Sequence, residues 1–210
     1  MSTAAASDRW AVLAAWRALR DRFREGHRAL APGAWRAWLL TMAIGIATLL
    51  GVMVVLMTVA QRLLAAGRLD WESAFLQRLG SDGPFSFASG VFFQTFGTDI
   101  TLVILVGAAA SAAAWTRRPV TALSIVLAPL VADLVGRFGW ALWDRARPDV
   151  LHGGLASPGF HAFPSGHTSK TTAAYGFLAL LWILASRSIL ERMLAVLLLL
   201  AIITATALGR

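Results

Sequence analysis

The chain has 210 residues, of which 58% are hydrophobic and 14% are charged, and it contains no cysteine. Soluble domains carry about 25% charged residues, so this composition indicates a membrane protein. Without cysteine, neither a disulfide framework nor a cysteine-based metal site is available. The formal charge of +8 comes almost entirely from arginine, since Lys170 is the only lysine. Basic residues do not alternate with aromatic ones as they would in a soluble nucleic-acid binder, so nucleic acid is not an expected partner.

Residues 1–33 form a basic arm ahead of the first long apolar run. From Trp10 to Arg28 apolar residues alternate with arginines, which is typical of an amphipathic helix on an anionic membrane surface. The Ala-Pro-Gly sequence at 31–33 is expected to end that helix. The arm is too polar and too long for a secretory signal peptide.

Five apolar runs follow in the region 34–210, which we predict to be one membrane domain. A helix needs about twenty apolar residues to cross a hydrocarbon core. The runs are Trp38–Ala60, Ile100–Thr116, Val120–Trp143, Thr168–Ala185 and Met193–Leu208. Residues 61–99 are expected to hold a short amphipathic helix, a turn at 80–84 and an interfacial aromatic stretch at 85–96. The predicted fold class is therefore an all-α, polytopic bundle of membrane helices with five spans.

Basic residues in the connections predict the orientation of the bundle. If five spans alternate, the arm, the Arg117-Arg118 turn and the turn at 186–192 lie on one side, which the positive-inside rule makes cytoplasmic. The outer face then receives the end of the third span, the start of the fourth and the end of the fifth. The arginine-rich, cysteine-free composition fits a bacterial inner membrane.

The sequence Pro164-Ser165-Gly166-His167 directly precedes the fourth run. Ser165 is a favourable helix N-cap, and the amides of the following turn point out of the helix end, where the helix dipole favours anions. Gly166 lets a ligand approach the backbone, and His167 lies where it could donate a proton to a bound group. The motif therefore predicts a phosphate site. An ordinary capped helix with an interfacial histidine is the alternative.

Arginines gather at the two other outer-face helix ends. Arg145 and Arg147 follow the third span, and Arg210 follows the fifth. One guanidinium group can donate two parallel hydrogen bonds to a phosphate group, so arginines at these helix ends favour a phosphate-binding site. Taken singly, each arginine is also explained as an interfacial anchor. As a set on the outer side they run against the charge bias and indicate a bound anion.

These residues resemble the type 2 phosphatidic acid phosphatase superfamily, membrane lipid phosphatases that share a site with vanadium haloperoxidases. That family has three motifs: Lys, six residues, Arg-Pro; Pro-Ser-Gly-His; and Ser-Arg, five residues, His, three residues, Asp. The resemblance runs from Trp38 onward, and the second motif is complete. It implies a metal-free and cofactor-free phosphoryl transfer from a lipid phosphate.

The resemblance also implies a role for each matching residue. Arg147 and Arg210 would grip phosphate oxygens, Ser165 and the Gly166 amide would bind them too, and His167 would protonate the leaving group. The histidine of the third motif would be the nucleophile, held by the aspartate that follows it.

Two departures from the family pattern stand out. Trp140 takes the place of the first-motif lysine, and either Arg137 or Lys170 could supply the missing cation, each one helical turn from a motif residue. An Asp133–Arg137 ion pair, spaced i to i+4, is the alternative for the first, and a polar cavity between spans is the alternative for the second. Charged residues within spans are functional candidates by default.

The third motif begins at Gly209-Arg210, with glycine where the family usually has serine, and the sequence stops there without the motif's histidine and aspartate. We therefore expect a fragment of a longer chain or a shortened copy, and a chain that ended at Arg210 would bind phosphate weakly and hydrolyse it very poorly. His27, His152 and His161 do not replace the nucleophile by motif. The rivals to a phosphatase are a non-catalytic phosphate-lipid-binding protein of the same fold and a transporter with an anion site. Transporters place such sites near the bilayer midplane, which disfavours the second rival.

Overall fold

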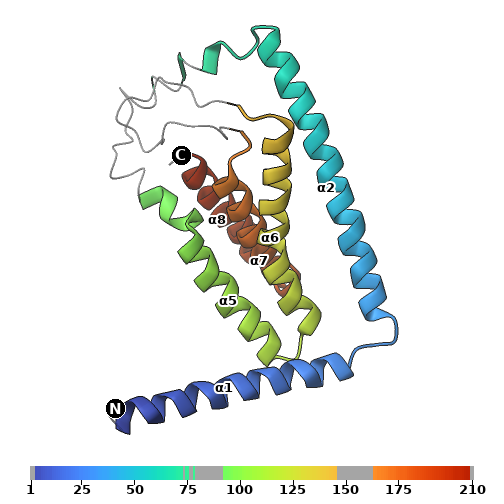
Figure 1. Ribbon diagram of the computed structural model, residues 1–210, viewed down its shortest axis with the longest axis vertical. Coiled ribbons are helices and arrows are strands. Elements are labelled where there is room, and N and C mark those ends of the chain that lie inside the picture. The colour runs from blue at the N-terminus through green and yellow to red at the C-terminus, as the bar shows by residue number, and fades with distance from the viewer. Residues whose placement is uncertain (1–2, 73, 76–77, 79–91, 146–162, 209–210) are drawn as a thin grey trace. The chain divides into compact units, whose positions relative to one another are not determined.

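The computed structural model describes residues 3–72, 74–75, 78, 92–145 and 163–208. Every regular element in these ranges is helical, which confirms the predicted all-α class. The elements are α1 (Thr3–Arg28), α2 (Ala34–Ala65), the 3₁₀ helix η1 (Thr95–Gly97), α5 (Asp99–Trp115), α6 (Pro119–Leu142), α7 (Gly166–Ala185) and α8 (Ile189–Leu208) (Figure 1). The turn expected at 80–84, most of the aromatic stretch at 85–96 and the loop at 149–162 lie outside the described residues.

Three of these helices, α2, α6 and α8, are long and apolar enough to cross a membrane. Among the five runs expected to span, α5 is apolar but only 17 residues long. α7 has 20 residues, but its first two turns are rich in threonine, serine and lysine, which lowers its apolar character. The described residues thus support three candidate spans, and the five-span bundle stays a prediction.

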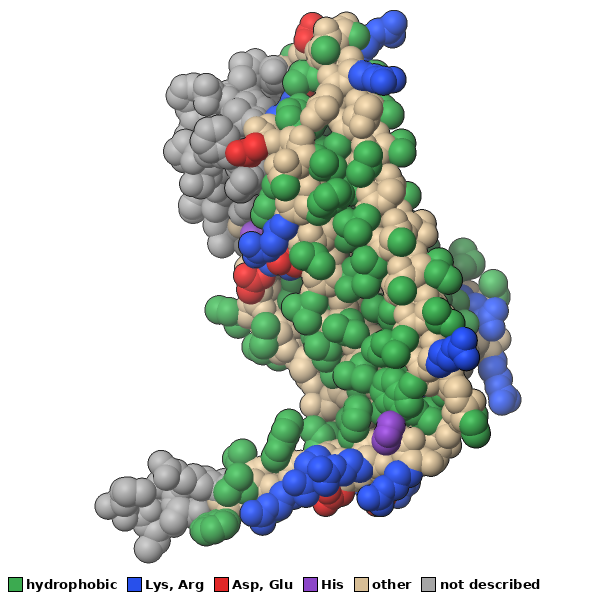
Figure 2. All heavy atoms as spheres, turned by 45° about the vertical axis from the view of Figure 1, so that its right-hand side comes forward, with side chains coloured by type: hydrophobic (Ala, Val, Ile, Leu, Met, Phe, Trp, Pro, Cys, Tyr) green, Lys and Arg blue, Asp and Glu red, His purple; other side chains and the backbone are tan. Residues whose placement is uncertain are grey.

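Apolar side chains cover the outer surfaces of the candidate spans. On α2, Ile44 is 66% exposed, and on α8 Leu197 is 60% exposed. Figure 2 shows hydrophobic side chains along the visible length of α2. Soluble monomers rarely expose apolar surface so continuously, and a hydrocarbon environment would cover it. The surface therefore agrees with the composition in indicating membrane association.

The described chain divides into two compact units, of which the first comprises Met1–Ala43 and Val103–Leu127. Here α1 contacts the turn that joins α5 to α6. Arg117 occupies the left-handed backbone region of that turn, with φ of 58°. The amides of Arg117 and Arg118 close the end of α5 by bonding to the carbonyls of Ala114 and Ala113, the pattern of a Schellman motif. Pro119 then starts α6, where its fixed φ is favourable.

Glycine at position 26 brings α1 close to this turn. A Cβ at Gly26 would lie 2.4 Å from the Arg117 carbonyl oxygen, so a larger residue would force the backbones apart. Beside it, Arg117 Nε donates to Glu25 Oε2 at 2.7 Å, and the Arg22 guanidinium lies 5.6 Å from the Trp115 ring centroid. Cation–π and ionic contacts thus flank a glycine-mediated close approach.

The second unit comprises Ile44–Leu102 and Ala128–Arg210 and holds the candidate site. α7 and α8, joined by a short connection, pack along each other, and η1 contacts both. Gly97 of η1 is buried, and a Cβ there would lie 2.8 Å from Thr171 Oγ1 and 2.8 Å from Thr206 Cγ2. The glycine therefore lets η1 settle against the start of α7, beside His167.

Candidate functional site

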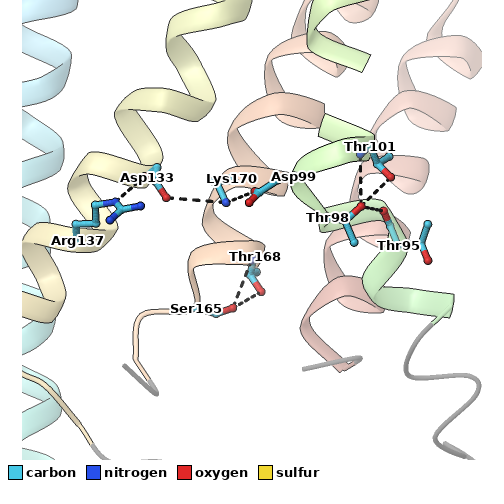
Figure 3. Close-up of polar contacts among 9 residues, drawn as sticks. All are labelled: Thr95, Thr98, Asp99, Thr101, Asp133, Arg137, Ser165, Thr168 and Lys170. Atoms are coloured by element: carbon cyan, nitrogen blue, oxygen red, sulfur yellow. Dashed lines mark hydrogen bonds and ion pairs between the residues drawn. The ribbon is translucent and has the colours of Figure 1, made fainter. Parts of the chain in front are cut away.

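The N-terminus of α7 has the capped geometry that the Pro-Ser-Gly-His motif predicts. Ser165 is the N-cap, with extended backbone angles, φ −71° and ψ 114°. Its Oγ accepts hydrogen bonds from the Thr168 amide at 3.4 Å and from the Thr168 hydroxyl at 3.1 Å (Figure 3). The Ser165 hydroxyl retains its own proton for donation, and the first-turn amides of Gly166 and His167 point out of the helix end. The structure thus confirms the cap on which the predicted anion site depends.

Trp140, at the position of the family's first-motif lysine, packs against this helix start. Its Nε1 donates to the Pro164 carbonyl at 2.9 Å. A Cβ at Gly166 would lie 3.3 Å from two carbon atoms of the Trp140 ring, and one at Gly139 would lie 3.0 Å from Pro164 Cδ. Trp140 of α6 therefore helps to fix the backbone of residues 164–166. The sequence motif, in which Trp140 only replaces the expected lysine, did not predict this role.

Lys170 lies one turn beyond His167 and forms an ion pair with Asp99, the first residue of α5. Its Nζ is also 4.0 Å from Asp133 Oδ1 on α6. The Lys170 side chain is only 17% exposed, which keeps both interactions partly shielded from solvent. Figure 3 shows the Lys170 ammonium between the two carboxylates, which come from two other helices.

Arg137 completes this charged cluster. Its Nε donates to Asp133 Oδ2 at 2.7 Å, the i to i+4 pair that was the alternative to a phosphate contact. Two cations and two carboxylates, namely Arg137, Lys170, Asp99 and Asp133, give the cluster a formal charge of zero. The cluster links α5, α6 and α7 at the second turn of α7.

Arg145 is likewise engaged by a carboxylate. Its NH1 and NH2 groups donate to Glu72 Oε1 and Oε2 at 3.3 and 2.5 Å, and its side chain is 18% exposed. The same guanidinium lies 5.6 Å from the Trp143 ring centroid. Arg145 therefore ties the end of α6 to the segment after α2. A phosphate contact by Arg145 would require the exchange of Glu72 for the ligand.

Two predicted phosphate ligands, Arg147 and Arg210, lie outside the described residues, as do His152 and His161. The structure brings together the N-cap Ser165 with Gly166, His167 and Lys170 in the first two turns of α7. Arg137 lies on α6 and pairs there with Asp133. His27 belongs to the other unit, where its Nδ1 accepts a hydrogen bond from Trp35 Nε1 at 2.7 Å. Among the described residues, no group of three or more His, Asp or Glu is arranged to hold a metal ion.

Comparison of the chain with protein-family models, with curated proteins and with solved structures gave no significant match.

Proposed function

We propose that this chain is an integral membrane protein that binds the phosphate group of a lipid phosphate or diphosphate at the N-terminus of α7 and hydrolyses it. The proposal combines the complete Pro-Ser-Gly-His motif with the capped geometry at that helix start. A hydroxyl, outward-pointing amides and an imidazole within one turn form a chemically coherent oxyanion site. The pre-organised cap at Ser165 is the observation that carries the proposal.

In the proposed reaction, the amides and Ser165 hold the non-bridging oxygens while His167 donates a proton to the leaving oxygen. Histidine suits this task because its ordinary pKa of about 6.5 lies near neutral pH. The family resemblance assigns the attack on phosphorus to the third-motif histidine, without metal. Water then cleaves the resulting phosphohistidine, with His167 accepting the proton of the attacking water, and releases inorganic phosphate. Arg147 and Arg210 are proposed to neutralise the phosphate.

The membrane setting of the proposal follows from the sequence. Five spans, a cytoplasmic N-terminus and a site at the extracytoplasmic face of a bacterial inner membrane satisfy the arginine distribution. A phosphate headgroup would reach the start of α7 from the outer leaflet while its acyl or prenyl tail stays among the apolar helices. Lipid phosphate is therefore the expected partner.

A second candidate function is binding of lipid phosphate without turnover. The pairing of Arg137, Arg145 and Lys170 with carboxylates favours it, because cations already neutralised contribute less to a phosphate cradle. In a site with few available cations, binding of the phosphate would depend mostly on the Ser165 hydroxyl and the backbone amides at the start of α7.

The two candidates are separated by measuring release of inorganic phosphate and binding of a short-chain phosphatidic acid in the same detergent preparation. His167→Gln should lower release by about 10²–10⁴-fold if His167 is a general acid. His27→Gln, a matched histidine change outside the site, should leave release unchanged. Binding without release identifies the non-catalytic candidate. Absence of both, in protein that keeps its helical circular dichroism and elutes as a single species, refutes the phosphate site.

A further inference from the structure

An apolar stripe runs along α1, and its two halves differ in burial. Val12, Trp16, Leu19, Phe23 and Gly26 are spaced four, three, four and three residues apart, so they share one helix face. Gly26 is buried, and Leu19 and Phe23 are half-buried. Val12 and Trp16 are 69% and 64% exposed. The stripe is therefore packed at its C-terminal end and uncovered at its N-terminal end.

The packed end fixes how α1 is rotated about its axis. Gly26 approaches the backbone of the α5–α6 turn, Glu25 pairs with Arg117 of that turn, and Arg22 lies against the Trp115 ring at the end of α5. α5 and α6 are apolar helices, and in a membrane the charged turn that joins them would lie at the edge of the hydrocarbon layer. Because Val12 and Trp16 share the helix face of Gly26, a helix docked there through Gly26 would turn these two side chains toward the same layer.

Arginines outnumber carboxylates on the remaining surface of α1, where Asp21 pairs with Arg20 at 3.1 Å and Glu25 with Arg117. Arg17, Arg20, Arg24 and Arg28 are exposed and, at spacings of three, four and four, form a second stripe beside the apolar one. Figure 2 shows Lys and Arg side chains gathered along this helix. Arginine stems can lie along an interface while their guanidinium groups reach lipid phosphates. Apolar insertion and anionic attraction thus act on the same helix.

We propose that the N-terminal half of α1 docks on an anionic lipid surface, with Val12 and Trp16 inserted below the headgroups and the arginine stripe bound to lipid phosphates. The C-terminal half is the fixed anchor on the α5–α6 turn. Anionic lipid is the occupant that fits because an apolar strip flanked by cations matches the headgroup boundary of such a membrane. This inference does not depend on the proposed phosphatase activity.

The absence of cysteine makes a direct test available. Val12→Cys and Ala14→Cys place single thiols on nearly opposite faces of α1, because two residues turn a helix by about 200°. Each full-length variant is labelled with an environment-sensitive fluorophore and reconstituted in nanodiscs of phosphatidylcholine with or without phosphatidylglycerol. Quenching by spin-labelled lipid is compared with quenching by aqueous iodide.

The label at 12 should be quenched by lipid and protected from iodide in anionic nanodiscs, and the label at 14 should show the reverse. Replacing Arg17 by Gln in the Val12→Cys background should lower the ratio of lipid-contacting to water-exposed label about fivefold. Equal iodide access at 12 and 14, or protection at 12 that is the same in detergent or without anionic lipid, would overturn the proposal. The second result would identify a protein contact instead.

Discussion

Replacing Lys170 by Met tests whether the charged cluster of Asp99, Asp133, Arg137 and Lys170 stabilises the fold. The change keeps the apolar stem and removes the ammonium, which leaves Asp133 paired with Arg137 and takes from Asp99 its lysine partner. The cluster then carries a formal charge of −1. Asp133 keeps its 2.7 Å partner, so the cost falls mainly on Asp99, whose side chain is 76% exposed.

These facts bound the size of the effect. An exposed ion pair contributes about 0.2–1 kcal/mol, and a charge at the centre of a membrane helix costs about 2.5–3.5 kcal/mol. Lys170 is mostly buried, but its strongest partner lies at a helix end, so we expect a loss of about 1–2 kcal/mol. For a chain of this size that corresponds to a fall in Tm of roughly 2–8 °C.

The assay is thermal unfolding in detergent, followed by the loss of the monodisperse elution peak. Adding Asp99→Asn to Lys170→Met restores a neutral cluster and should recover most of the loss. Arg187→Met removes an exposed cation from the α7–α8 turn and should shift Tm by less than about 2 °C. If the double variant is as unstable as Lys170→Met alone, packing and not charge accounts for the effect, and the electrostatic reasoning fails.

Three further predictions concern the two units. Gly26→Ala places a methyl group 2.4 Å from a backbone oxygen, so it should detach α1 from the turn and make α1 more susceptible to protease. Gly45→Ala, with nothing within 4 Å, should stabilise α2 by about 0.5–1 kcal/mol. Equal rates of digestion of the two variants would contradict the close approach at Gly26. The hydrogen bond from Arg117 lowers the pKa of Glu25 below its ordinary value of 4.5. The Glu25–Arg117 pair should therefore contribute fully to the free energy of unfolding above pH 4.5, and this contribution should disappear as pH falls through the lowered pKa. In Glu25→Gln the free energy of unfolding should lose this part of its pH dependence, and a pH profile equal to that of the unchanged protein would refute the prediction. Trp140→Phe removes the indole donor at the α7 start and should weaken phosphate-lipid binding several-fold, whereas Trp182→Phe should bind normally; equal affinities would remove Trp140 from the positioning of the site.

Local features of this chain were readable from sequence because they depend on residues a few positions apart. The Ser165 cap involves Thr168 three residues later, and the Asp133–Arg137 pair spans one helical turn. The third predicted span, Val120–Trp143, differs from α6 by one residue at each end. Caps, i to i+4 pairs and long apolar runs follow from backbone geometry alone.

Helix ends outside the apolar runs were less predictable. The first span was placed at Trp38–Ala60, but α2 extends from Ala34 to Ala65 and includes Arg36 and Arg62. A charged residue marks where a helix leaves the apolar layer, but the helix itself continues, because arginine is a good helix former with a long side chain.

Contacts between distant segments explain what the sequence did not reveal. Lys170 pairs with Asp99, 71 residues away, and Arg145 pairs with Glu72, 73 residues away. Both cations were candidates for phosphate binding, and nothing in the local pattern indicated that carboxylates on other helices would engage them. The support that Trp140 gives to Pro164 is also tertiary, and it turns a departure from the motif into a structural feature of the site.

This pairing changes how the site would bind an anion. With Lys170 and Arg145 held by carboxylates, the groups of the helix start itself, Ser165 Oγ and the amides of Gly166 and His167, become the principal ligands. Hydrogen bonds from amides to an oxyanion are charge-assisted and directional, so they define a position and not only a charge. The location of a bound anion is therefore the sharpest prediction of the proposed function.

The most direct test is to locate tungstate, a strongly scattering phosphate analogue, in an experimental structure of the full chain in lipid. The proposed function predicts one tungstate with oxygens about 3 Å from Ser165 Oγ and from the Gly166 and His167 amides. A fully occupied tungstate elsewhere, or an empty α7 start at saturating tungstate, would contradict it.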